Sequence, residues 1–149
     1  MRRLILSILI AFLMTACSHD FKSFHSSDSS FSFSAPSYCQ MSDSSNAYVA
    51  LHDEGHACTI TVTRDSTLTF SIFSSRVEKI IASAPSNLPI SQVEENDSMI
   101  SFVTTDNLYQ ANNYYFFKRG RHANYYLTIT GNSLGLDDAL HIYTSLHEQ

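Results

Sequence analysis

Two histidines spaced four residues apart are the side chains of this sequence most suited to metal chemistry. His52 and His56 flank the polar segment Asp53-Glu54-Gly55, and across a hairpin their imidazoles could approach each other, with a carboxylate as third ligand. The order is not the H-E-x-x-H of a zinc-binding helix, and Gly55 disfavours the helix that would align the two rings. The pattern therefore favours a polar hairpin tip with solvated histidines, and we expect neither a metal nor another cofactor.

Catalytic groups show no recognisable arrangement. A nucleophilic serine needs an oriented base beside it, and no such base is evident in the sequence for any of the serines. The carboxylates Glu94 and Asp97 could form an acid–base pair, but their setting is typical of surface charge. We therefore expect a protein that is not an enzyme. The alternative is a hydrolase that uses one of His122, His141 and His147.

The beginning of the sequence has the form of an export signal. Arg2 and Arg3 make a positive start, and the apolar run 4–13 is interrupted only by Ser7. A run of about ten apolar residues is too short to span a bilayer, which needs about 20. Small residues follow the run, so residues 1–16 are predicted to be a secretory signal peptide.

The residues Met14-Thr15-Ala16-Cys17 resemble the lipobox of bacterial lipoproteins. In that family the cysteine sulfur receives a diacylglycerol, the signal is removed, and the new amino group is acylated, which gives a stable membrane anchor. Met14 stands where leucine is usual, and Ser18 stands where aspartate would favour the inner membrane. The resemblance implies a lipidated Cys17 and an outer-membrane protein whose domain faces the periplasm. The alternative is an ordinary signal peptide with a chance cysteine.

Two further cysteines, Cys39 and Cys58, form an even pair. In the oxidising periplasm such a pair predicts a disulfide, whose loop of about 20 residues would stabilise the fold by about 3 kcal/mol. The alternative is two buried thiols. A redox centre is not indicated, because the sequence has no CxxC motif.

Residues 17–30 are predicted to be a flexible, serine-rich tether. Six serines fall in this segment, and Phe21 and Phe24 are its only large apolar residues. Coil of about 14 residues reaches about 20 Å, which would hold a domain just off the membrane. The globular domain is therefore expected to span 31–149.

Alternating apolar residues predict strands along this domain. The run Cys58, Ile60 and Val62, with threonines between, is the clearest, and the turn before it predicts a hairpin with the preceding strand. Strands are expected at 31–35, 48–52, 58–63, 90–95, 98–104, 114–119 and 123–130.

A 3.6-residue period predicts two helices. The first is expected over about 74–84, with a capping box from Ser75 to Glu78, although residues from Leu68 onward fit both a strand and a helix. The second is expected from Leu136, and its apolar side chains lie on one face. Strands, helix, strands and helix together predict an α+β fold, an antiparallel sheet covered by two helices.

The segment 31–36 reads Phe-Ser-Phe-Ser-Ala-Pro, and Ser145-Leu146 lie at the end of the last expected helix. These residues and the order of elements resemble the PsbP-like fold, including the bacterial DcrB-like domains, which begin with F-x-F-x-x-P and often end their last helix with Ser-Leu. The tryptophan often found after the first proline is missing. The resemblance covers about 31–146 and implies a non-enzymatic domain that docks on larger complexes; it transfers no binding residues.

An aromatic hairpin is the candidate binding surface. The segments 114–117 and 125–126, Tyr-Tyr-Phe-Phe and Tyr-Tyr, place large rings on both faces of two adjacent strands. One face should pack on the core, and an open second face would be typical of a docking site. Tyr115 and Tyr126 are the residues expected to contact a partner. The alternative is a sheet buried on both faces.

The tip of the same hairpin holds a basic cluster. Lys118, Arg119 and Arg121, beside His122, form the densest positive segment of the chain. They could bind an acidic partner or a phosphate-bearing lipid. The alternative is a solvated turn that keeps a sheet edge from aggregating.

Net charge narrows the class of partner. Without Arg2 and Arg3 the chain has seven basic and fourteen acidic residues, a net charge of −7, which argues against nucleic acid. We expect a lipid-anchored, non-catalytic periplasmic domain that docks on envelope proteins. The alternative is a lipoprotein that binds a small ligand or a metal, either through His52 and His56 or in a pocket between a helix and the sheet.

Overall fold

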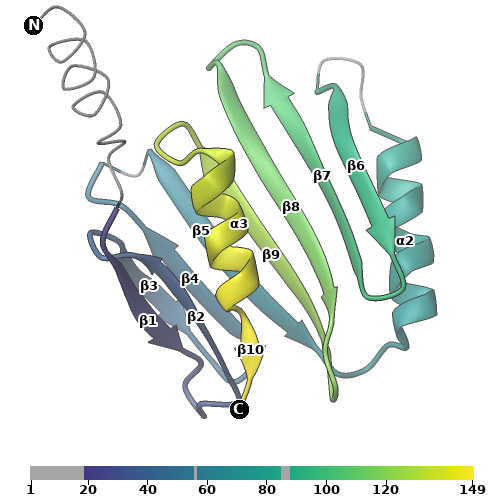
Figure 1. Ribbon diagram of the computed structural model, residues 1–149, viewed down its shortest axis with the longest axis horizontal. Helices are drawn as coiled ribbons and strands as arrows, with labels where there is room; N and C mark the ends of the chain where they lie inside the picture. Colours follow the sequence, from purple (N-terminus) through teal and green to yellow (C-terminus); the bar gives the residue numbers. More distant parts are fainter. Residues whose placement is uncertain (1–18, 56, 85–87) are drawn as a thin grey trace, which may run out of the picture.

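The computed structural model describes residues 19–55, 57–84 and 88–149 (Figure 1). The signal segment 1–16 and Cys17 lie outside these residues, so the signal-peptide and lipidation predictions stay untested. In chain order the described elements are β1 Phe21–His25, β2 Phe31–Pro36, β3 Gln40–Ser44, β4 Tyr48–His52, β5 Cys58–Asp65, α2 Phe70–Ala82, β6 Ile90–Asn96, β7 Met99–Asp106, β8 Ala111–Arg119, β9 Asn124–Gly131, α3 Leu136–Ser145 and β10 His147–Glu148.

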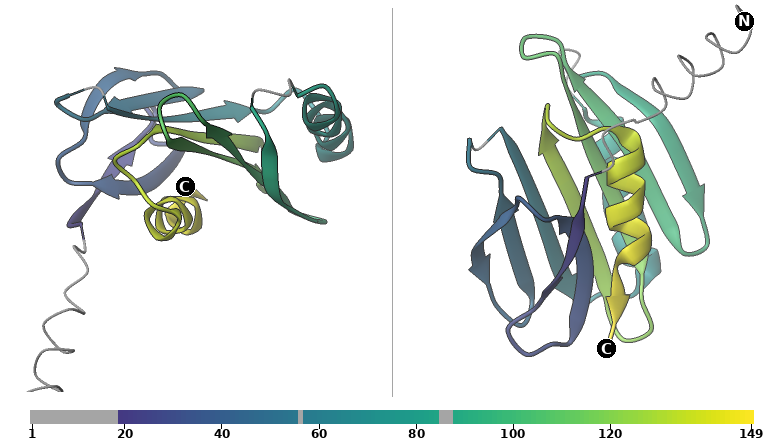
Figure 2. Two further views of the ribbon diagram at one scale, coloured as in Figure 1. Left: turned by 90° about the horizontal axis from the view of Figure 1, so that it is seen from above. Right: turned by 60° about the vertical axis from the view of Figure 1, so that its left-hand side comes forward.

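Two antiparallel sheets build the domain. The large sheet has the strand order β3-β4-β5-β9-β8-β7-β6, and the small sheet has the order β1-β2-β10. The pairing of β5 with β9 joins an N-terminal run of hairpins to a C-terminal one. The small sheet and α3 lie on one face of the large sheet, and α2 lies on the other, as the view from above shows (Figure 2).

Strict alternation in the central strands separates these two faces. On β5 the side chains of Cys58, Ile60 and Val62 are buried, while the threonines between them are half-buried on the opposite face. Leu127 and Ile129 of β9 are cross-strand partners of Val62 and Ile60 and are also buried. The expected hairpin of β4 with β5 is confirmed by its register.

The main core lies between the large sheet, the small sheet and α3. Phe31 and Phe33 of β2 are fully buried against it, and Ala139 and Ile142 face it from α3. Phe31 packs edge-on against Tyr125 of β9 with ring centroids 5.6 Å apart. Burial of such side chains in a shared apolar layer is the main stabilising term of the fold.

A smaller core lies on the other face, beneath α2. Phe73 and Val77 of α2 are buried against Ile100 and Phe102 of β7 and Phe117 of β8. The helix covers the β7–β9 part of the sheet and leaves the threonine face of β5 without a helix over it. The predicted fold class, α+β with two helices on an antiparallel sheet, is confirmed.

Helix α2 begins four residues before the expected start. It starts at Phe70 with Thr69 as N-cap, and no side chain caps it, so the predicted capping box of Ser75 and Glu78 is wrong. Packing decides the start, because Phe73 needs the helical conformation to lie 4.3 Å from the ring of Tyr126. Local propensity from Leu68 onward did not distinguish strand from helix.

The tether prediction for residues 17–30 is wrong for the part that the structure describes. Residues 21–25 form β1, which pairs with β2 in the register Phe24↔Phe33. Phe24 is buried, and its ring stacks on that of Phe33 at 6.0 Å. Two phenylalanines are sufficient to order this serine-rich segment as a strand, because β2 has an edge available for pairing and the ring of Phe33 packs against Phe24.

Two polar strands, β3 and β10, were also not predicted from the sequence. β3 is the edge of the large sheet, and nearly all of its side chains are exposed, so it has no apolar period. β10 has two residues and pairs with β2. Strands of this kind are specified by a partner strand rather than by their own alternation. Within the described residues, no helix is both long and apolar enough to cross a membrane.

Candidate binding cleft between helix α2 and the sheet

An open cleft of about 440 Å³ lies between the C-terminal end of α2 and the large sheet. Three neighbouring strands, β7, β8 and β9, form its floor, and the end of α2 and the start of β6 form its sides. The floor consists of Phe102, Thr104, Tyr115, Phe117, Tyr126 and Thr128. These side chains belong to one face of the sheet, the face opposite the main core.

Strand register brings the aromatic rings of the floor together. Phe102 is the cross-strand partner of Tyr115, and Phe117 is the partner of Tyr126. The rings of Phe102 and Tyr115 are stacked with centroids 4.7 Å apart. Phe117 and Tyr126 meet edge to face at 5.3 Å. Offset and edge-on contacts of this kind hold aromatic side chains in fixed positions.

Helix α2 closes one end of this floor and leaves the other open. Phe73 lies against Phe117 and Tyr126, with centroid distances of 5.6 and 4.3 Å. Two to three turns later, Ile80, which is 54% exposed, and the C-cap residue Ser83 line the cleft without sealing it. The cleft is therefore the part of the sheet face that the helix does not cover.

The chemistry of the cleft is that of an uncharged site. Of the described residues that line it, none carries a charge, and its polar groups include the hydroxyls of Ser83, Thr104 and Thr128. Burial, followed by the nearby charge of Asp65, raises the pKa of Tyr126, so this phenol stays protonated at neutral pH. The cleft suits a mainly apolar, uncharged group with a hydrogen-bonding edge.

The two tyrosines singled out in the sequence, Tyr115 and Tyr126, both lie in this cleft and are half-buried. Tyr114 and Phe116 point to the main core from the other face of β8. The alternative of a sheet buried on both faces is right only in part, because α2 buries Phe117 and leaves the two tyrosine rings accessible.

The predicted basic cluster is divided between the two faces of the sheet. The ammonium of Lys118 donates to the carbonyl of Leu146 and lies 5.2 Å from the ring centre of Tyr143. Burial lowers the pKa of Lys118, and the charge of Glu148 opposes that shift. Arg119 lies on the opposite face, and the structure does not join it to Lys118 in one patch.

Glu148 holds the hairpin tip where these basic residues lie. The sequence did not predict this role of Glu148. Its carboxylate accepts backbone N–H bonds from Arg121 at 2.8 Å, His122 at 3.0 Å and Ala123 at 3.1 Å, and the hydroxyl of Tyr125 at 3.1 Å. The Arg121 segment is therefore a built turn rather than a free anion site. An acidic residue near the end of a chain gives no sequence signal for such a role.

A Cβ atom on Gly120 would lie 2.6 Å from this carboxylate and 2.6 Å from the carbonyl of Ala123. Glycine at this position therefore lets the tip close over the carboxylate of Glu148.

Cys39 and Cys58 are buried and free thiols in the structure. Burial, followed by the charge of the neighbouring Cys58, raises the pKa of Cys39 to about 12, and burial raises that of Cys58 to about 11. The two side chains are thus close enough for charge on one to disfavour charge on the other. The disulfide is not formed in the structure and stays a prediction for an oxidising compartment.

The histidine pair is not tested. His52 is the last residue of β4 and is half-buried, whereas His56 lies outside the described residues. Among residues 19–55, 57–84 and 88–149, no group of three or more His, Cys, Asp or Glu side chains is placed to hold a metal ion.

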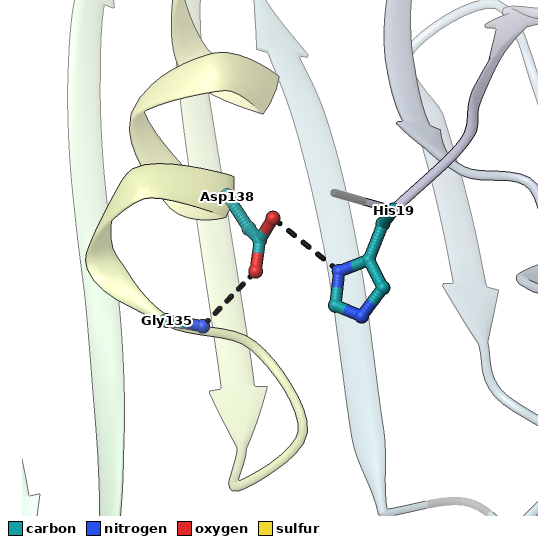
Figure 3. Close-up of polar contacts among 3 residues, drawn as sticks. All are labelled: His19, Gly135 and Asp138. Carbon is teal, nitrogen blue, oxygen red and sulfur yellow. Dashed lines mark hydrogen bonds and ion pairs between the residues drawn. The ribbon is translucent and has the colours of Figure 1, made fainter. Parts of the chain in front are cut away.

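The first described residue is fixed to the start of α3 (Figure 3). His19 Nδ1 lies 3.3 Å from Asp138 Oδ1, an ion-pair distance for a protonated imidazole, although its angle is not that of a hydrogen bond. The other oxygen of Asp138 accepts the backbone N–H of Gly135 at 3.3 Å. The imidazole also meets the ring of Tyr38 edge-on at 5.4 Å. The N-terminal segment therefore reaches the domain at one defined end.

Comparison with known proteins supports the fold. No protein-family model matches the sequence, and no curated protein shows a significant match. The solution structure of cyanobacterial PsbP (CyanoP) from Synechocystis sp. PCC 6803 is similar, with a TM-score of 0.53 and 9% sequence identity over 87% of this chain and 92% of that chain. At this identity the likeness concerns the fold alone, and it shows that the domain is an α+β sandwich of the PsbP-like type.

Proposed function

We propose that the protein is an outer-membrane lipoprotein whose PsbP-like domain docks on an envelope protein in the periplasm and catalyses no reaction. The observation that carries this proposal is the open, uncharged cleft lined by Tyr115 and Tyr126. The lipid anchor at Cys17 rests on the lipobox pattern.

The cleft has the features expected of a site for an apolar side chain of a partner protein. Aromatic rings held in place by stacking and edge contacts form its floor. Tyrosine is enriched in such sites because its ring is apolar and its hydroxyl can remain hydrated. Burying one large apolar side chain of the partner would contribute about 1.5–3 kcal/mol.

Two isoleucines of α2 give a matched test of this site. Ile80 lines the cleft and is 54% exposed, while Ile72 is 50% exposed and lies outside it. In-cell crosslinking of the lipidated protein should recover a stoichiometric envelope partner. Ile80→Lys should reduce that recovery at least about tenfold, which corresponds to about 1.4 kcal/mol, and Ile72→Lys should not.

Cys17→Ser serves as the control for the anchor and should remove the acyl groups from the intact mass of the protein. Equal recovery from the Ile80→Lys and Ile72→Lys proteins would contradict docking through the cleft. An intact mass of the wild-type protein without acyl groups would contradict the lipid anchor instead.

A small apolar ligand is the second candidate, favoured by the volume of the cleft. About 440 Å³ falls in the range of roughly 300–1,000 Å³ typical of small-molecule sites. The purified domain alone should then bind the apolar dye N-phenyl-1-naphthylamine with saturation, and Ile80→Lys should abolish this binding while Ile72→Lys preserves it. Absence of saturable binding by the wild-type domain would leave docking as the function of the cleft.

A further inference from the structure

The position of the first described residue limits how far the domain can lie from a membrane. Cys17 precedes His19 by two residues, and two residues span at most about 7 Å. His19 lies 3.3 Å from Asp138 at the start of α3, and the next residue is fixed because the carbonyl of Asp20 accepts the N–H of Ser37 at 2.7 Å. If Cys17 is lipidated, as proposed above, this end of the molecule lies at the bilayer surface.

The hairpin between β7 and β8 ends on the same side. Figure 1 shows its tip at the end of the domain where β1 and α3 begin, and Asp106 of β7 pairs with Ala111 of β8 next to this tip. Leu108 and Tyr109 form the tip. With 81% and 71% of their surfaces exposed, they are the most exposed large apolar side chains of the described residues.

The backbone of this tip is built to hold the two side chains outward. The carboxylate of Asp106 accepts the N–H of Leu108 at 2.9 Å and that of Tyr109 at 3.2 Å. Gln110 takes a positive φ of 51° to return the chain to β8. Asp106 therefore turns its charge toward the backbone of the turn, and leucine and tyrosine form the outer surface.

The hairpin tips at the opposite end of the domain have a different composition. The β6–β7 turn is Asn96-Asp97-Ser98, and the β8–β9 turn is Gly120-Arg121-His122. Both are polar or charged, as solvated turns usually are. Among the hairpins of β6 to β9, only the β7–β8 tip has exposed large apolar residues. This tip lies at the end that the proposed lipid anchor would bring to the membrane.

We infer that Leu108 and Tyr109 are a membrane-contact tip, which enters the headgroup region of the leaflet that holds the lipid of Cys17. Leucine reaches the acyl boundary, and tyrosine suits the interface because its ring is apolar and its hydroxyl remains among headgroups and water. The inference rests on the proposed lipid anchor. The tip adds a second point of attachment and so fixes the orientation of the domain on the membrane.

The absence of tryptophan from the chain makes a direct test possible. The lipidated Tyr109→Trp protein is reconstituted in phosphatidylcholine vesicles with brominated or ordinary acyl chains. The matched control is His122→Trp, an exposed site at the opposite tip. Bromine quenches tryptophan only at close range, so brominated lipid should cause a loss of emission from Tyr109→Trp and none from His122→Trp.

Equal quenching of the two proteins, or quenching of neither, would overturn the inference. Intact mass measured on the same samples separates this failure from failure of the anchor. An acylated protein without selective quenching refutes the tip alone, whereas an unacylated protein refutes the anchor and the tip with it.

Asp20 directly precedes β1, and Asp137 lies in the first turn of α3, so both carboxylates belong to this end. Their charges oppose an anionic surface, so the selective loss of emission should decrease as phosphatidylglycerol replaces phosphatidylcholine. An increase instead would show that the contact is electrostatic, and would contradict insertion by Leu108 and Tyr109.

Discussion

A single carboxylate, that of Glu148, organises the β8–β9 tip. Burial alone would raise its pKa, but the backbone N–H groups of His122 and Arg121, with the Tyr125 hydroxyl and Ala123, lower it below the usual 4.5. The charged form is therefore favoured in the folded protein. Because the folded pKa is depressed, Glu148 contributes stability above the pKa of the unfolded chain and loses that contribution as the pH falls through the folded value.

Replacing this carboxylate should destabilise the domain in a pH-dependent way. Glu148→Gln should lower the free energy of unfolding by about 1–2 kcal/mol at neutral pH, since hydrogen bonds to a charged acceptor are lost. At a pH below the folded pKa of Glu148, where the carboxylate is protonated, the difference from wild type should shrink. Urea unfolding at both pH values measures it, with the exposed Glu54→Gln as control. A difference that does not change with pH would show that the charge is unimportant.

The thiols of Cys39 and Cys58 give a second prediction at this scale. Their pKa values of about 12 and about 11, together with burial, should make both unreactive toward iodoacetamide at neutral pH in the folded, reduced protein. Protein taken from the periplasm and denatured without reductant should gain no adducts at these positions, because the disulfide blocks them. Two adducts would show that the thiols remain free and that the disulfide prediction is wrong.

At the scale of elements, α2 depends on few contacts. Phe73 and Val77 are its fully buried side chains, whereas α3 packs into the larger core. Helix α3 is thus part of the main fold, and α2 is a cover whose removal would expose the cleft floor. Helix α2 should therefore open more readily than the sheet.

Phe73→Ala should undock this helix. Loss of the ring contacts with Tyr126 and Phe117 should cost about 3–5 kcal/mol locally, so amide exchange across 70–82 should become fast while the protection of β5 and β9 persists. Ile72→Ala, on the exposed side of α2, should change exchange little. Uniform loss of protection in both regions would show that α2 and the sheet unfold together.

The elements predictable from the sequence were those with their own apolar period. β5, β9 and α3 alternate or repeat clearly, and each lies where one face meets the main core. β1, β3 and β10 were missed because neighbouring strands, not their own residues, define them. Tyr115 and Tyr126 were predicted to form a binding surface, whereas a pocket between a helix and the sheet was only an alternative, since no period shows which face of β8 a helix will cover.

At the scale of the whole molecule, the two ends of the domain differ in character. One end has His19, the Leu108-Tyr109 tip and several carboxylates; the other has the Arg119–His122 turn held by Glu148 (Figure 1). The expected tether of about 14 residues would have allowed free rotation. Because β1 begins at Phe21, a lipid on Cys17 would instead hold the β8–β9 turn away from the membrane, where soluble partners can reach it.

Alternation along the strands also affects how such a domain can evolve. Phe102, Tyr115 and Tyr126 line the cleft, while their neighbours Val103 and Tyr114 belong to the main core on the opposite face. Substitutions in the first set alter the binding surface and leave the packing of the second set in place. Relatives could therefore acquire different partners while retaining one scaffold. The residues that specify recognition are thus physically separate from those that specify the structure.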